Sequence, residues 1–232
     1  MDFENELISG SLIKRYKRFF VDIKINNKTV TCHCPNTGSM MGLLDKNNKV
    51  WVSKSNNLNR KLQYTLQIIE KNKCKIGVNT LLTNKIFFEA LENDKINSFK
   101  GKKKIKREFK FNSNTRFDFF IEEQKAKSLI EVKNVTLSRK KGIAEFPDAV
   151  TARGFKHIEE LLKASNQGYK IYLIFIIQRN DCDKIEIAKD IDPDYYNLLI
   201  KAVKKKLNVL CYDCKFSAKG IKLNQELELK LR

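Results

Sequence analysis

The segments Arg116-Phe117-Asp118-Phe119-Phe120-Ile121 and Leu129-Ile130-Glu131-Val132-Lys133-Asn134-Val135 decide how this chain folds. Both are apolar and rich in strand-forming residues, and the polar residues 122–128 between them predict a hairpin loop. Side chains of a strand alternate between two faces, so Glu131 and Lys133 share a face. Pairing of the two strands can set Asp118 opposite them.

Charged side chains inside such apolar strands are costly to bury unless they are paired or hold a cation. Asp118 and Glu131 offer the hard oxygen ligands that suit Mg²⁺. Lys133 beside them could orient or activate an attacking water and offset negative charge on a phosphate in the transition state. The alternative is a hairpin with one solvated face, on which these side chains have no chemical role.

The charge balance of the chain is strongly basic. The 232 residues include 46 Lys and Arg against 27 Asp and Glu, a net charge of +19 at pH 7. Such a field attracts polyanions, nucleic acid first and anionic membrane second. An AT-rich genome that enriches Lys, Asn and Ile is the alternative explanation, and it would leave most lysines solvated and idle. With 42% hydrophobic residues the composition is otherwise that of a soluble globular protein.

Neither a signal peptide nor a membrane span is indicated. Residues 1–6 are acidic, and the longest apolar run, Ile171 to Ile177, is too short to cross a bilayer. We therefore expect a cytoplasmic protein without a membrane partner, whose six cysteines are reduced thiols. Cys32-x-Cys34 and Cys211-x-x-Cys214 could together bind zinc, but only one pair has the usual spacing, so small buried side chains are the favoured interpretation.

Short strands separated by turns dominate the first third of the chain. Residues 19–25 alternate between apolar and polar side chains, and Asn26-Asn27 can adopt the positive φ of a tight hairpin turn. The chain then returns as a strand over 30–34. Further strands are predicted at 50–53 and 62–69.

About five strands of this kind predict a five-stranded barrel of the oligonucleotide-binding (OB) type over residues 1–76. Basic residues lie beside Tyr16, Phe19 and Tyr64, and such interleaved groups can track a phosphate backbone and stack bases. Alternatively, the aromatic side chains are core and the charges are its rim, as the apolar face of Phe19 suggests. The candidate nucleic-acid-binding residues of the barrel are Lys14, Arg15, Lys17, Arg18, Arg60 and Lys61.

Residues 77–232 predict a domain with a mixed α/β sheet. A helix capped by Asn79 or Thr80 and ending near Asn93 comes first. On this helix Glu89 shares a side with Leu82, Ile86 and Ala90, which makes it a candidate site residue at a core position. The strands are expected at 105–111, 115–121, 129–135, 169–177 and 209–212, and the later helices at 147–164, with Asp148 near its start, and from Asp192-Pro193 to about 206, before a charged tail.

The order of elements, with Glu89, Asp118 and Glu131-x-Lys133 on successive elements, resembles the PD-(D/E)XK nuclease superfamily. Longer phrases resemble the sugar fermentation stimulation protein A family. These phrases are Lys14-Arg15-Tyr16-Lys17-Arg18-Phe19, His33-Cys34-Pro35-Asn36-Thr37-Gly38-Ser39-Met40, Gly77-Val78-Asn79-Thr80, Glu131-Val132-Lys133-Asn134-Val135-Thr136-Leu137 and Phe146-Pro147-Asp148-Ala149-Val150-Thr151-Ala152-Arg153-Gly154-Phe155-Lys156-His157. Tyr64-Thr65-Leu66-Gln67 departs from the family, where Trp-Glu is expected after the Thr.

The resemblance implies an OB-type barrel fused to a nuclease-like domain, with DNA as the partner and a regulatory link to sugar utilisation. It also implies a Mg²⁺ or Mn²⁺ cofactor and assigns roles to residues. Asp118, Glu131, Glu89 and the carbonyl of Val132 would be metal ligands, Lys133 would position the water, and Arg153, His157 and Gln178 would line the cleft against phosphate. Arg116, at the start of the strand that carries Asp118, is a further candidate nucleic-acid-binding residue.

Three functions remain open at this point. The first is a metal-dependent phosphodiesterase acting on single- or double-stranded DNA. The second is a DNA-binding regulator on a nuclease fold without catalysis. A partner in nucleotide or RNA processing is a weaker third.

Overall fold

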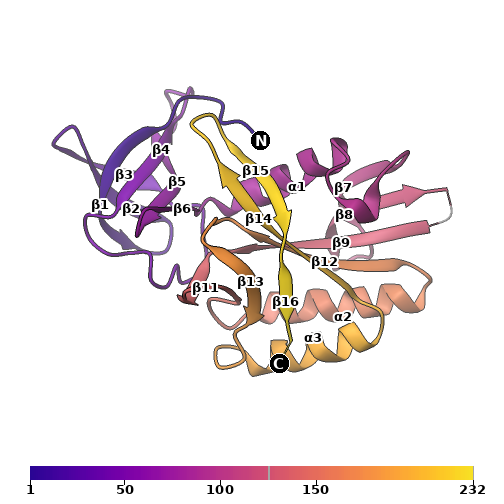
Figure 1. The fold of residues 1–232 in the computed structure, drawn as a ribbon. Coiled ribbons are helices and arrows are strands. Elements are labelled where there is room, and N and C mark those ends of the chain that lie inside the picture. The colour runs from indigo at the N-terminus through magenta and orange to yellow at the C-terminus, as the bar shows by residue number, and fades with distance from the viewer. Residues whose placement is uncertain (125, 232) are drawn as a thin grey trace.

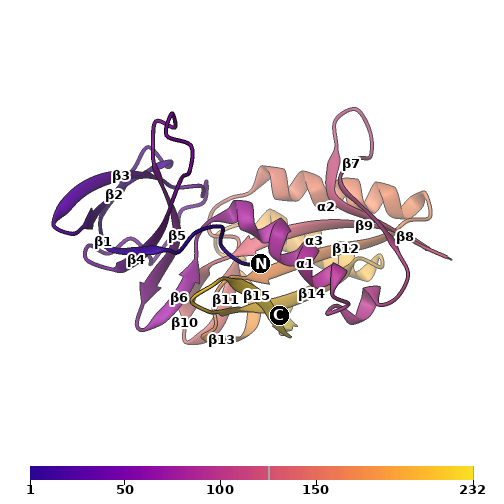
Figure 2. The ribbon, with the colours of Figure 1, turned by 90° about the horizontal axis from the view of Figure 1, so that it is seen from above.

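The computed structural model describes residues 1–124 and 126–231, and its first strands close into a ring (Figure 1, Figure 2). These strands are β1 (Ile8–Tyr16), β2 (Phe20–Ile25), β3 (Lys28–His33), β4 (Lys49–Lys54) and β5 (Tyr64–Lys71). They pair in the order β3-β2-β1-β4-β5, and a bridge between His33 and Thr65 joins β3 to β5. The predicted five-stranded OB barrel is confirmed, and β6 (Cys74–Gly77) extends it as a hairpin with β5.

Alternation of apolar side chains builds the barrel core. Val21 and Ile23 of β2 are fully buried, and Asn26 and Asn27 take the predicted positive φ, 46° and 64°. The prediction that Phe19 is a core residue was wrong. It lies in the turn before β2 and is 45% exposed, because the strand starts only at Phe20 and its first inward side chain is Val21.

A six-stranded sheet in the order β15-β14-β12-β9-β8-β7 forms the second part of the molecule. Its strands are β7 (Lys104–Lys110), β8 (Arg116–Glu123), β9 (Ala126–Val135), β12 (Lys170–Ile177), β14 (Asn208–Phe216) and β15 (Ile221–Glu226). β9, β12 and β14 run parallel, and the other neighbours are antiparallel. β12 is buried from Ile171 to Ile177, because both faces of the central sheet are covered.

Helices cover the two faces of this sheet (Figure 1). α2 (Ala152–Asn166) and α3 (Pro193–Lys204) pack on one face, and α1 (Thr83–Glu92) packs on the other. Two 3₁₀ turns, η1 (Thr80–Leu82) and η2 (Asn97–Phe99), flank α1. The sheet lies between two cores, and β9 contributes side chains to both, Leu129 and Val135 to one and Ile130 and Val132 to the other.

Several boundaries differ from the sequence prediction. α2 begins at Ala152 rather than near 147, and the hydroxyl of Thr151 caps it by accepting a hydrogen bond from the Gly154 N–H at 3.1 Å. The charged tail contains a strand, β15, because Ile221 and Leu223 alternate inward between charged residues.

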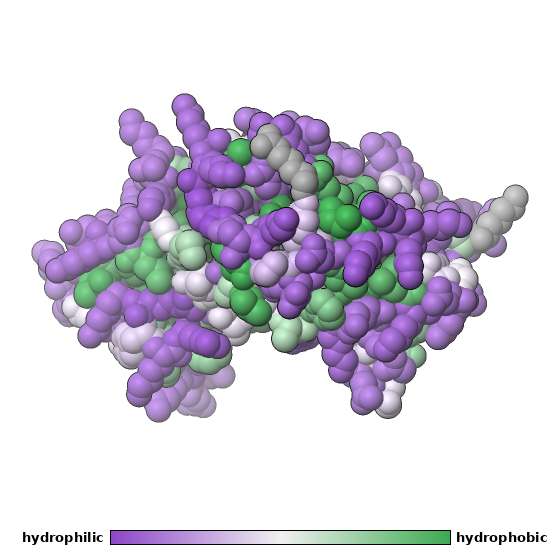
Figure 3. Space-filling view, turned by 90° about the horizontal axis from the view of Figure 1, so that it is seen from below, coloured by the Kyte–Doolittle hydropathy of each residue, from purple (hydrophilic) through white to green (hydrophobic). Residues whose placement is uncertain are grey.

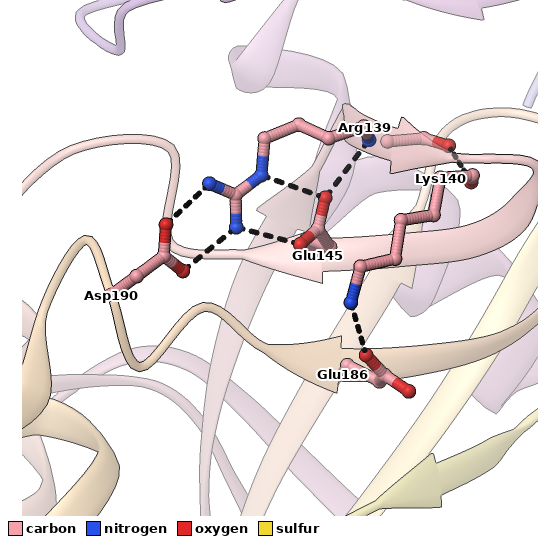
Figure 4. A network of polar contacts seen from close by, with 6 residues as sticks. Arg139, Lys140, Glu145, Glu186 and Asp190 are labelled. Atoms are coloured by element: carbon pink, nitrogen blue, oxygen red, sulfur yellow. Dashed lines mark hydrogen bonds and ion pairs between the residues drawn. The ribbon is translucent and has the colours of Figure 1, made fainter.

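A small second sheet was not predicted. It comprises β10 (Leu137–Lys140), β11 (Gly142–Phe146), β13 (Cys182–Ile187) and β16 (Glu228–Lys230). Its strands are short and rich in charge, which hides the alternation that reveals longer strands. Charged pairs link its strands, and one of them, Arg139 with Asp190, also holds the sheet to the loop before α3 (Figure 4). Arg139 Nη2 donates to Glu145 Oε1 at 2.7 Å and to Asp190 Oδ1 at 2.8 Å, whereas Lys140 reaches Glu186 at only 3.4 Å.

Arg139→Ala is expected to lower the free energy of unfolding by about 1.5 kcal/mol, because Glu145, 3% exposed, would keep its charge without a partner. Lys140→Ala is the matched control on the same strand. It removes a largely exposed ion pair and should change stability by less than about 0.5 kcal/mol. Urea unfolding of the two variants measures the difference, and equal effects would contradict the role given to Arg139.

Two hydrogen bonds donated by backbone N–H groups of the barrel hold it against the sheet domain. Gly77 N donates to Gln178 O at 2.8 Å, and Met40 N donates to Asp148 Oδ2 at 3.1 Å. Gly38 lies so close to Asp148 that a Cβ would sit 2.5 Å from its Oδ2. The barrel loop therefore forms a wall beside the sheet.

None of the helices in residues 1–124 and 126–231 has the length and hydropathy needed to cross a membrane. Hydrophilic side chains cover most of the face shown in Figure 3, and apolar groups occupy smaller areas between them.

Candidate metal centre and nucleic-acid cleft

Asp118 lies where β8 separates from β9. The ladder between these strands ends at the pair Phe119 and Ile130. Beyond it, Asp118 Oδ2 accepts a hydrogen bond from the Val132 N–H at 2.7 Å, and Oδ1 accepts one from Asn84 Nδ2 of α1 at 2.7 Å. The carboxylate is therefore held by a strand on one side and a helix on the other.

Glu131 and Lys133 share a face of β9, as their spacing predicted, and meet α2. Lys133 Nζ donates to Glu131 Oε1 at 2.7 Å. His157 Nδ1 contacts the same carboxylate oxygen and lies 3.2 Å from Lys133 Nζ. Glu131 is 3% exposed, and its Oε2 finds no hydrogen-bond partner among the described residues.

The two carboxylates differ in their proton affinity. Burial, followed by the charge of Glu131, raises the pKa of Asp118 to about 7. Burial would also raise the pKa of Glu131, but Lys133 and His157 outweigh it and hold that pKa below the ordinary value. Asp118 thus carries an unfavourable charge that a cation would relieve.

The donor set suits a hard divalent cation. In the described part of the chain no group of three or more His, Cys, Asp or Glu side chains is arranged to hold a metal ion. Mg²⁺ needs fewer, because it takes one or two carboxylates and completes its shell with waters and phosphate. The unpartnered Oε2 of Glu131 and the second lone pairs of Asp118 provide that set.

These acids line a cleft of about 370 Å³. Its wall also carries basic side chains from three other elements, Lys85, Arg107 and Arg153, together with Lys133. Carboxylates in a basic cleft match the two needs of a phosphodiester site, a metal position and cations for the phosphate.

Two family models match most of the chain. The model of the SfsA N-terminal OB domain matches residues 13–78, and that of the sugar fermentation stimulation protein RE domain matches residues 81–220. The chain belongs to the sugar fermentation stimulation protein family. The family resemblance drawn from the sequence phrases is thereby confirmed.

Relatives match the chain from end to end. The sugar fermentation stimulation protein homolog of Pelagibacter ubique is 50% identical over 99% of both chains. The homolog of Pseudoalteromonas atlantica is 41% identical, also over 99% of both. The solved structure of Pyrococcus furiosus SfsA in complex with Ca²⁺ has a TM-score of 0.90 at 24% identity and covers 99% of this chain and 98% of that one, which shows a shared fold.

Within this family fold, Glu89 does not join the other acids. Its carboxylate pairs with the amino group of Met1 and does not line the cleft. Helical geometry explains the correction, because five residues at 3.6 per turn place Glu89 about 140° round the helix from Asn84. Asn84, and not Glu89, is the residue of α1 that contacts Asp118.

Gln178 does not face nucleic acid either. Its side chain is fully buried, and Nε2 donates to Asn134 Oδ1 at 2.6 Å and to Thr83 Oγ1 at 3.1 Å. It therefore braces β9 against α1 beneath the cleft. His157 contacts Glu131 and Lys133, so its place is in the acid cluster rather than on a phosphate.

The predicted basic residues are dispersed. Arg153 lines the cleft, and its Nε approaches His157 Nε2 at 3.4 Å. Arg116 is exposed at the start of β8, outside the cleft lining, where it pairs in register with Lys110. In the barrel, Lys14, Lys17, Arg18 and Lys61 are exposed, and Arg60 lies 3.4 Å from His33 Nδ1.

Arg15 is the exception, because its guanidinium is used by the protein itself. It donates to the carbonyl oxygens of Asn36 at 2.6 Å, Gly38 at 3.0 Å, Ser39 at 3.2 Å and Arg18 at 2.9 Å. These bonds hold the barrel loop 36–39, which lies against Asp148 of the sheet domain. Arg15 is therefore not the free phosphate ligand that the sequence predicted.

Arg15→Ala is expected to lower the free energy of unfolding by about 1.5 kcal/mol, since four carbonyl groups would lose a charged donor. Lys14→Ala should cost less than about 0.5 kcal/mol, because Lys14 is exposed and its ammonium group lies 5.5 Å from the centre of the Tyr16 ring. Thermal and urea unfolding of both variants test this. If the two variants are equally stable, Arg15 does not hold the loop, and it is again a candidate for nucleic-acid binding.

Sequence reasoning missed Asn84, Lys85 and Arg107. An Asn-Lys pair early in a helix carries no signal of a site. Arg107 lies in a basic strand, where nothing distinguishes it from its neighbours. In the fold, its guanidinium lies 5.0 Å from the centre of the Phe88 ring.

Proposed function

We propose that this protein binds DNA in the cleft of the sheet domain and hydrolyses phosphodiester bonds with Mg²⁺ or Mn²⁺. The observation that carries the proposal is the convergence of Asp118, Glu131 and Lys133 in one basic cleft. The structure of Pyrococcus furiosus SfsA in complex with Ca²⁺ adds support, since Ca²⁺ prefers the same oxygen ligands.

The basic surface extends from the cleft toward the barrel. Leu81 and Lys85 line both the cleft and a neighbouring hollow of about 500 Å³. That hollow also includes His33 and Arg60 of the barrel. A strand with its phosphate in the cleft can therefore follow basic groups onto the OB barrel, in accord with the net charge of +19.

The chemistry follows from the groups in the cleft. A divalent cation between Asp118 and Glu131 would polarise the phosphoryl oxygens and promote attack by water. Lys133, an ammonium group with donors and no acceptor, would hold the water and offset charge on the phosphate. The water oxygen bonds to phosphorus and the bond to one sugar oxygen breaks. The attacking water releases a proton to solvent, and the leaving sugar oxygen takes one from solvent. His157 keeps Glu131 and Lys133 in place.

Cleavage of end-labelled single- and double-stranded DNA with Mg²⁺, Mn²⁺ or EDTA tests the proposal. We expect cleavage that requires the metal. A DNA-binding regulator without catalysis, with a role in sugar utilisation, is the second candidate, favoured by the charge and the barrel. It predicts binding that weakens steeply as salt rises, with no cleavage under any metal.

A further inference from the structure

A second pocket adjoins the metal cleft and is not used by the proposed chemistry. It lies between the barrel loop 36–38, Thr80, strand residues 134–137 and the segment 145–151, and has a volume of about 230 Å³. We call it the junction pocket. It shares Thr80 and Asn134 with the cleft, so the two hollows meet along one wall.

The two hollows differ in the basic side chains that line them. No Lys, Arg or His lines the junction pocket, in contrast to the four basic side chains in the cleft. Its two carboxylates already have partners, because Glu145 accepts from Arg139 and Asp148 accepts from Met40 N. A phosphate would meet acids and no cation there, so the pocket suits an uncharged group.

The remaining lining is apolar and hydroxyl-bearing. Phe146, Pro147 and Val150 contribute apolar surface to this pocket. Val150 is 75% exposed, which is unusual for a large apolar side chain. Thr37 is exposed at the rim. The oxygen of Asn134 accepts from Gln178 and Thr83, which leaves its Nδ2 as a donor on the wall that the two hollows share. Apolar surface beside a few donors and acceptors is what a nucleobase requires.

From this juxtaposition we propose that the junction pocket binds the base of the nucleotide next to the phosphate in the metal cleft. The volume is below the roughly 300–1,000 Å³ of pockets for drug-sized ligands and suits a single base. A base held there is unpaired, so the substrate is single-stranded DNA or a nucleotide turned out of a duplex. This inference rests on the proposed function, because it takes the phosphate position from the metal cleft.

Single-stranded oligonucleotides that carry one abasic residue at successive positions test the proposal. Wild-type protein with Mn²⁺ should cut one of the two bonds beside the abasic residue at least about fivefold more slowly than the same bond in the intact strand, as expected for loss of one stacked base. Val150→Ser should slow cleavage of the intact strand but not of the abasic one. Leu58→Ser, a change at an 84% exposed residue of a barrel loop, is the matched control and should alter neither.

Equal cutting of intact and abasic strands would overturn the base pocket while leaving the nuclease standing. If wild-type protein cuts no strand, the proposed catalysis fails, and binding then decides the pocket. Fluorescence anisotropy of labelled hexanucleotides in Ca²⁺ should show at least about fivefold weaker binding of the strand with a central abasic residue, and Val150→Ser should remove that difference. Equal affinities would reject the pocket independently of any cleavage.

Discussion

Replacing Glu131 and Lys133 together with alanine is expected to abolish metal-dependent DNA cleavage, by about 1,000-fold or more. The change removes the carboxylate oxygen that lacks a partner and the ammonium that contacts its other oxygen at 2.7 Å. Affinity for DNA should fall little, since Lys85, Arg107 and Arg153 remain in the cleft. Single-turnover cleavage and a parallel anisotropy titration measure the two effects separately.

The same hairpin offers a matched control. Glu122 and Lys127 form an exposed ion pair at 3.7 Å, opposite each other on β8 and β9 but away from the cleft. Replacing both with alanine removes one acidic and one basic charge from the same hairpin and should leave cleavage unchanged. Comparable losses in the two double variants would mean that the effect comes from the hairpin's stability and not from the site. Full activity without Glu131 and Lys133 would sink the catalytic assignment.

The sequence was informative wherever a pattern is local. The spacing of Glu131 and Lys133 fixes a common face on a strand, and this geometry needs no other part of the chain. The apolar run in β12 likewise predicts a central strand by itself. The segments that resemble the family also predicted the order of the two domains, the barrel first and the sheet domain second.

Features that depend on distant partners could not be predicted. Glu89 occupies an apolar side of its helix by spacing, yet its carboxylate meets the amino group of Met1. Gln178 follows a buried strand, so its place in the sequence predicts an accessible residue at the end of the sheet. In the folded chain its side chain donates to Asn134 and Thr83, which are distant in sequence. Arg15 and Lys14 are neighbours in a basic phrase, and only the position of loop carbonyls separates their roles.

Asp118→Asn is expected to stabilise the metal-free protein at pH 8 by about 2 to 3 kcal/mol. The pKa of Asp118 is raised from 3.8 to about 7 in the folded chain, so the folded state binds its proton more tightly than the unfolded state. This contribution is complete below pH 3.8 and is lost as pH rises through 7. A shift of this size is worth roughly 4 kcal/mol, and the asparagine gives up about 1 kcal/mol because its nitrogen cannot accept one of the two hydrogen bonds.

The sign of the effect makes the test specific. At pH 5 the folded protein keeps the Asp118 proton but the unfolded chain has released it, which costs wild type roughly 1.6 kcal/mol. The hydrogen bond that the asparagine lacks offsets about 1 kcal/mol of this, so its advantage should shrink to under about 1 kcal/mol. Urea unfolding in EDTA at pH 5 and pH 8 compares the variant with wild type, and Asp183→Asn, a change at an exposed aspartate, serves as control with little effect at either pH. An Asp118→Asn protein no more stable than wild type at pH 8 would contradict the raised pKa. A gain that grows from pH 5 to pH 8 would mean that the fold keeps at this position a charge that opposes its own stability, as expected of a site built to receive a cation.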